Sequence, residues 1–114
     1  MWEPKSFSRD KTFQMDVVNW QAIARTIAEL TKDVVSDLRR KGLWGRTVTI
    51  KIRYSDFRTV TRACSSRDVF GRDDEIRRLA FSCLKRVDLV GKKVRLIGVR
   101  VTNLEKVENV PLPV

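Results

Sequence analysis

The chain has 114 residues, of which 42% are hydrophobic and 33% charged, so it suits one globular domain with a modest core and excludes a disordered segment. Its 24 lysines and arginines against 14 acidic residues give a net charge of +10. This charge indicates a polyanionic partner, and it favours nucleic acid over an anionic membrane surface. No apolar run approaches the ~18 residues of a membrane span, and the N-terminus has no signal-peptide pattern, so we expect a cytoplasmic protein with no membrane partner.

The folded domain is predicted over residues 5–104, with residues 1–4 as a linker remnant and residues 105–114 as a tail without clear periodicity. A first strand is expected from Lys5 to Phe13, basic and rich in hydroxyls. A long helix follows, capped by Asp16, whose carboxylate can accept from the free amides of the first turn, and ended by Gly42. Its apolar residues recur every three or four positions and form a stripe that faces the core: Trp20, Ile23, Ile27, Leu30, Val34 and Leu38.

The stretch from Gly45 to Arg62 predicts a hairpin. Between residues 47 and 54, apolar residues alternate with polar ones at the period of two that is typical of a half-buried strand. A tight turn at residues 55–56 leads to a returning strand over residues 57–62. In that strand Phe57 and Val60 can both point inward only if the strand contains a bulge, so its alternation is ambiguous.

Residues 64–72 predict a loop, and Asp73 predicts the cap of a second helix with Asp74 and Glu75 in its first turn. These acids complement the helix dipole better than they make a metal cluster. The expected buried face is Ile76, Leu79, Ala80, Cys83, Leu84 and Val87. The two cysteines, Cys64 and Cys83, are expected to be free thiols, and in a chain without histidine they cannot complete an ordinary zinc site.

Gly91 allows a turn into a last strand whose residues Ile97, Val99 and Val101 face the helices. The order β-α-β-β-α-β predicts an α+β fold: a four-stranded antiparallel sheet with two helices on one face, because right-handed crossovers place both helices together. By alternation the other face carries hydroxyls and cations, which is typical of a phosphate-binding surface: Thr47, Thr49, Lys51, Arg53, Arg100 and Thr102. Gly98 on this face indicates a close approach of another group to the backbone.

Three segments carry a resemblance to a known family. They are KSFSRDKTF at residues 5–13, VTIKIRYSDFRTVTR at residues 48–62 and VRLIGVRVTNL at residues 94–104. They closely resemble the little-finger (polymerase-associated) domain of Y-family translesion DNA polymerases, in the DNA polymerase IV branch, and the resemblance covers about residues 4–105. It departs at residues 63–66, where the family usually has a second arginine after T-R-S and this chain has Cys64 nearby.

The resemblance implies that the domain holds the backbones of duplex DNA, as primer-template, for a polymerase active in lesion bypass and DNA repair. The parent chain would be a DNA-directed DNA polymerase whose palm uses magnesium, whereas this domain alone is expected to be non-catalytic and to need no cofactor. The family's DNA-facing positions correspond to Lys5, Ser6, Ser8, Arg9, Thr59, Thr61, Arg62, Arg100 and Thr102. Alternation alone adds Lys51 and Arg53. The implied partners are duplex DNA and the polymerase core, with a sliding clamp left open because residues 109–114 lack the glutamine and aromatic residue of the family's clamp-binding peptide.

Three alternatives remain beside this interpretation. An RNA-recognition module has the same element order, but it stacks bases on aromatic side chains of its central strands, where this chain offers threonines and cations. An acylphosphatase-like enzyme needs a phosphate-cradling loop with an arginine just after the first strand, and residues 14–16 do not supply one. A module for an acidic protein partner stays open, and competition between duplex DNA and an acidic protein would separate it.

Overall fold

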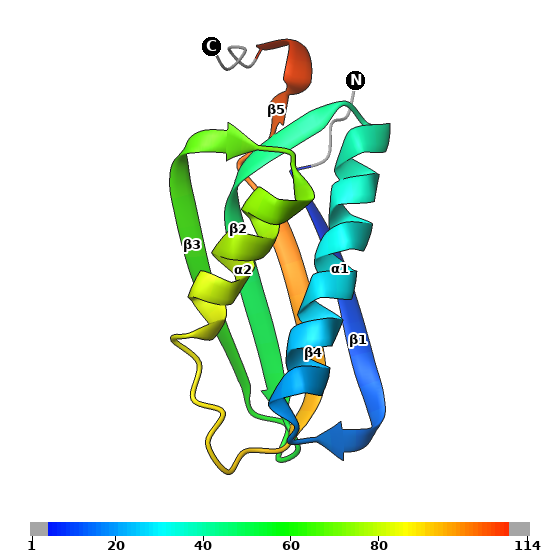
Figure 1. The fold of residues 1–114 in the computed structure, drawn as a ribbon, viewed down its shortest axis with the longest axis vertical. Coiled ribbons are helices and arrows are strands. Elements are labelled where there is room, and N and C mark those ends of the chain that lie inside the picture. The colour runs from blue at the N-terminus through cyan, green and yellow to red at the C-terminus, as the bar shows by residue number, and fades with distance from the viewer. Residues whose placement is uncertain (1–4, 110–114) are drawn as a thin grey trace.

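A computed structural model describes residues 5–109 as an α+β fold in which two helices lie on one face of an antiparallel sheet (Figure 1). The elements in chain order are β1 (Ser6–Val17), α1 (Trp20–Arg40), β2 (Leu43–Tyr54), β3 (Thr59–Phe70), α2 (Asp73–Leu84), β4 (Val94–Thr102), β5 (Glu105–Lys106) and a 3-10 turn (Val107–Asn109). The predicted order of the first six elements is confirmed. The predicted linker, residues 1–4, and residues 110–114 of the predicted tail lie outside the described residues.

The sheet has five strands rather than the predicted four. Its main path is β1-β4-β2-β3, and β5 pairs with the start of β2, so the first residues of the predicted tail belong to the fold. The central strands are therefore β2 and β4. Their inward residues, such as Ile50 and its partner Val99, are fully buried beneath α1 and α2, and this layer between sheet and helices is the core.

The first helix begins later than predicted. Its N-cap is Asn19, whose Oδ1 accepts from the backbone amides of Gln21 at 2.7 Å and Ala22 at 3.3 Å. Asp16 is not the cap, because β1 continues through residue 17. Its Oδ1 instead forms an ion pair with Arg95 Nε at 3.6 Å. Trp20, placed in the apolar stripe from sequence, is the first helical residue and is 54% exposed. The rest of the predicted stripe is buried: Ile23, Ile27, Leu30, Val34 and Leu38.

The turn between β2 and β3 resolves the predicted ambiguity in the hairpin. Phe57 lies in the turn with φ of 70°, and its amide donates to the carbonyl of Tyr54 at 2.9 Å. Since β3 starts only at Thr59, no inward-facing Phe57 has to be accommodated and the strand pairs regularly from Thr59 to Ser65 without a bulge. It then continues to residue 70, through the segment predicted to be a loop.

The second helix and the turn after it are close to the prediction. Asp73 is the first helical residue rather than the cap, which is Arg72 and makes no side-chain capping bond. The three acids stand in the first turn as expected, and Asp73 accepts from Arg77 at 3.3 Å. Gly91 has φ of 65°, which favours glycine at this turn. No helix in residues 5–109 is long and apolar enough to cross a membrane.

Candidate nucleic-acid interface

The sheet face that the helices leave uncovered is built from four cross-strand rows. In each row residues of β1, β4, β2 and β3 are paired side by side, so their side chains share one face. We call this surface the open face. Its rows are Ser6–Thr102–Thr47–Ser65, Ser8–Arg100–Thr49–Ala63, Asp10–Gly98–Lys51–Thr61 and Thr12–Leu96–Arg53–Thr59.

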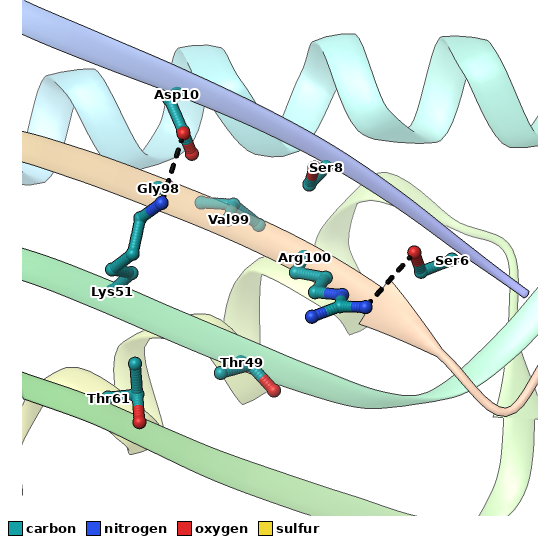
Figure 2. Close-up of a pocket in the computed structure, with 9 residues that line it drawn as sticks. All are labelled: Ser6, Ser8, Asp10, Thr49, Lys51, Thr61, Gly98, Val99 and Arg100. Atoms are coloured by element: carbon teal, nitrogen blue, oxygen red, sulfur yellow. Dashed lines mark hydrogen bonds and ion pairs between the residues drawn. The ribbon is translucent and has the colours of Figure 1, made fainter.

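A depression of about 220 Å³ lies on the open face. Figure 2 shows its lining residues projecting from all four strands of the main path, with the helices behind the sheet. The lining is hydroxylic and charged: Ser6, Ser8, Asp10, Thr49, Lys51, Thr61 and Arg100, with Gly98 and Val99. The surface is thus concave and polar at the place where alternation predicted phosphate donors.

The cations of the open face have different partners. Arg100 is exposed and its Nη2 lies 3.4 Å from Ser6 Oγ, while Arg53 Nε donates to Thr59 Oγ1 at 3.0 Å. Within residues 5–109, no carboxylate lies at ion-pair distance from either guanidinium. A neutral hydroxyl does not neutralise an arginine, so both retain their full charge for an anion arriving from solvent.

Lys51 instead is paired with an acid. Its Nζ lies 3.1 Å from Asp10 Oδ2, and the pair spans β4 above Gly98 (Figure 2). A Cβ on Gly98 would lie 2.3 Å from Asp10 Oδ1, so the missing side chain leaves room for this contact. Asp10 was not among the predicted site residues, although its alternation with Ser6 and Ser8 was the signal that could have placed it there.

Most of the predicted residues share the open face, namely Ser6, Ser8, Lys51, Arg53, Thr59, Thr61, Arg100 and Thr102. Lys5 precedes β1 and is exposed. Two residues are directed to the helix side instead, because they pair with inward-facing residues: Arg9 with Val99 and Arg62 with Ile50. A regular ladder allows neither of them to share a face with Arg100.

Arg9 has a structural partner on the helix side. Its Nε and Nη2 donate to the two carboxylate oxygens of Asp37 on α1, at 2.8 and 2.9 Å. Hydrogen bonding with Arg9 is the largest cause that lowers the pKa of Asp37 below its ordinary value, and the same contact raises the pKa of Arg9. Arg9 therefore ties β1 to α1.

Arg62 occupies an edge strand above α2. Its Nε donates to the carbonyl of Arg86 at 3.3 Å, and its Nη1 donates to the carbonyl of Thr61 at 2.7 Å. Arg62 therefore lies at the sheet edge and not on the open face, where the family resemblance had implied a DNA contact.

The aromatic side chains of β1 and β2 lie outside the four rows of the open face. Phe7, Phe13 and Tyr54 pack against the core, and the ring of Trp44 lies against Gly71. No aromatic side chain belongs to the four paired rows, where an RNA-recognition module would stack bases. Within residues 5–109, no three His, Cys, Asp or Glu side chains come together where they could hold a metal ion.

These features define a class: an α+β domain with a helix-free, basic sheet face that suits a polyanion. The chain belongs to the impB/mucB/samB family C-terminal domain, whose family model matches residues 4–113. This membership confirms the resemblance to the little-finger domain of Y-family DNA polymerases seen in the sequence.

The relatives are polymerases. DNA polymerase IV of Methanoculleus marisnigri is 46% identical over 101 residues, and DNA polymerase IV of Alkalilimnicola ehrlichii is 40% identical over 102 residues. The matches cover 89% and 90% of this chain but 28% of each relative, so the chain spans less than a third of their length.

Solved structures share the fold. A chimeric Y-family DNA polymerase superposes with a TM-score of 0.79 at 17% identity, covering 92% of this chain and 30% of that chain. The little finger domain of PolIV, solved in complex with the beta-clamp processivity factor, superposes with a TM-score of 0.69 at 18% identity. That match covers 96% of this chain and 91% of that chain.

Proposed function

We propose that this domain lays its open face along the backbones of duplex DNA and holds primer-template for a translesion DNA polymerase. The observation that carries the proposal is the position of Arg53 and Arg100, which project from the two central strands and whose side-chain partners within residues 5–109 are hydroxyls. Lys51 stands between them on the same face, and the serines and threonines around them add neutral donors. Charge-assisted bonds to phosphate fix the register of a protein on DNA without reading its sequence.

The rest of the polymerase would lie outside this chain, because the chain spans 28% of its DNA polymerase IV relatives. Nucleotidyl transfer needs carboxylates that hold magnesium, and residues 5–109 bring no such set together. Magnesium would therefore be held by the palm of the parent chain. A role in DNA repair is part of the same proposal, and its support is the family resemblance rather than the open face itself.

A sliding clamp is the second partner that we propose. The support is one structural relative, a PolIV little finger domain solved as a complex with the beta-clamp processivity factor. Gel filtration of this chain mixed with a bacterial-type clamp would show a shared peak if the two proteins associate. Separate peaks at micromolar concentrations would show that the clamp is not a direct partner of this domain.

Titration of labelled duplex DNA at several salt concentrations tests DNA binding. Four to six phosphate contacts predict a slope of roughly −4 to −5 in a plot of log affinity against log salt. Duplexes of unrelated sequence should bind with similar affinity. An acidic protein, added at the same concentration of negative charge as the duplex, should not displace the DNA. A salt-independent affinity, or preferential binding of the acidic protein, would refute the proposal.

A further inference from the structure

The only two cysteines of the chain meet between β3 and α2. Cys64 on β3 is paired with Val48, whose side chain is buried in the core, so the Cys64 thiol faces the helix side. Cys83 on α2 approaches from the opposite side, and its Sγ donates to the carbonyl of the same Val48 at 3.3 Å. The two thiols thus lie over one cross-strand pair, although 18 residues separate them in the sequence (64 and 83).

Their surroundings differ. Cys83 is fully buried, whereas Cys64 is half-buried on an edge strand. Arg86, just beyond α2, donates from Nη2 to Cys64 Sγ at 3.3 Å and to the carbonyl of Ala63. A partly exposed sulfur beside a guanidinium is the environment in which cysteines react, while a buried cysteine in apolar surroundings is inert towards external reagents.

The thiols also interact with each other. Burial raises the pKa of Cys83 to about 12, and hydrogen bonding with Cys64 and the charge of Cys64 act in the same direction. Arg86 is the neighbouring group that lowers it. Because Cys83 is buried and Cys64 is partly exposed, an oxidant reaches Cys64 first.

We propose that Cys64 is a site of reversible oxidation by peroxides and that Cys83 resolves the oxidised sulfur into a disulfide. In the first step the Cys64 sulfur attacks the O–O bond of hydrogen peroxide, forming a sulfenic acid and releasing water. In the second the Cys83 sulfur attacks the Cys64 sulfur, an S–S bond forms, the S–O bond breaks, and the oxygen leaves as water with the proton of Cys83. Two thiols and one peroxide become one disulfide and two waters.

The structure favours closure of this bond over further oxidation. Cys83 lies over the same Val48 pair as Cys64 and on the same side of the sheet, so the resolving thiol is adjacent when the sulfenic acid forms. The new bond would join β3 to α2 on the helix side of the sheet. The open face lies on the other side, so the site is independent of the proposed DNA contacts.

The test is intact-mass spectrometry of the reduced protein after dilute hydrogen peroxide, with thiol titration in parallel. We expect a monomer that loses the mass of two hydrogen atoms and both free thiols, and that regains both on treatment with dithiothreitol. A gain of oxygen atoms without that loss would overturn the proposal. So would a covalent dimer, or no change under conditions that oxidise glutathione.

Two variants assign the roles. Cys83→Ser keeps a donor near the Val48 carbonyl and should accumulate a sulfenic acid at residue 64 that dimedone traps and that proceeds to higher oxides. Cys64→Ser should leave Cys83 reduced over the same time. Cys83→Ala is the second choice if the serine variant does not fold, as judged by its thermal melt. Oxidation of Cys83 in Cys64→Ser at the wild-type rate would contradict the assigned order.

Discussion

Asp10 on β1 and Lys51 on β2 form an ion pair across the intervening strand β4, at 3.1 Å and directly over Gly98. The two residues are 41 positions apart in sequence. Both side chains remain partly exposed, at 44% and 36%, so the pair adds at most about 1 kcal/mol to stability. Its greater effect concerns the open face: Asp10 is the only acid among the residues of the four paired rows, and it neutralises a cation that would otherwise be available to phosphate.

Removing this acid should strengthen DNA binding. In Asp10→Asn the repulsion of phosphate is lost and Lys51 is released, so we expect affinity to rise by roughly fivefold, about 1 kcal/mol, and the salt slope to steepen by about 1. The matched control is Asp33→Asn, an equal change of charge at an exposed position of α1. Equal gains in the two titrations would mean that net charge alone governs binding.

Gly98, which lies beneath the Asp10–Lys51 pair, should tolerate substitution by alanine better than Gly45 on β2 does. In Gly98→Ala the new Cβ meets the carboxylate of Asp10 and Lys51 Cε, both near the ends of flexible side chains that can move aside. In Gly45→Ala it would lie 2.3 Å from Val101 Cγ1 in the core and 3.2 Å from the carbonyl of Thr102.

We therefore expect thermal melts to show a change below about 0.5 kcal/mol for Gly98→Ala and a loss of about 1–3 kcal/mol for Gly45→Ala. A large loss at residue 98 would show that the Asp10–Lys51 contact is rigid.

Arg100→Ala should weaken DNA binding by on the order of 1 kcal/mol, or about fivefold, because a charge-assisted phosphate contact is lost from the open face. Arg39→Ala, an exposed change on α1, should have less effect on affinity. Stability of both variants should move by less than about 0.5 kcal/mol, as thermal melts will check.

Arg62→Ala separates the family resemblance from the observed geometry. Since Arg62 pairs with Ile50 and donates to the carbonyls of Arg86 and Thr61, we expect its loss to weaken DNA binding less than that of Arg100. The measurement is the same titration on matched preparations. A loss as large as that of Arg100→Ala would establish that DNA also wraps the β3 edge.

The Arg9–Asp37 contact should make part of the stability depend on pH. The pKa of Asp37 is lowered in the folded state, first by Arg9, so the ion pair stabilises fully above the ordinary carboxyl pKa of about 4. This stabilisation disappears as the pH falls through the lowered value.

In Asp37→Asn the melting temperature should be lower than that of the wild type at pH 7, and the difference should shrink as the pH falls below about 4. Asp33→Asn makes the same charge change on the same helix without removing a hydrogen bond from Arg9, so it should lower the melting temperature at pH 7 by less. A difference that stays constant from pH 7 to strongly acidic pH would assign the effect to packing instead.

Local sequence patterns predicted much of the fold and part of the candidate site. The period of two in β2 put Lys51 and Arg53 on one face and Ile50 and Ile52 on the other, because side chains alternate across any strand whatever its neighbours are. The spacing of three and four in α1 placed its buried stripe for the same reason, since a helix has its own period. The excess of cations indicated a polyanion before any geometry was known.

Sequence alone failed where the outcome depended on a distant partner. Residues 64–70 are polar enough to predict a loop, yet pairing with β2 extends β3 through them. Arg9 and Arg62 match family contact positions, but their pairing with Val99 and Ile50 turns both to the helix side. Only the strand order could bring Asp10 beside Lys51 across β4, or Cys64 beside Cys83, because backbone pairing between remote segments leaves no local period in the sequence.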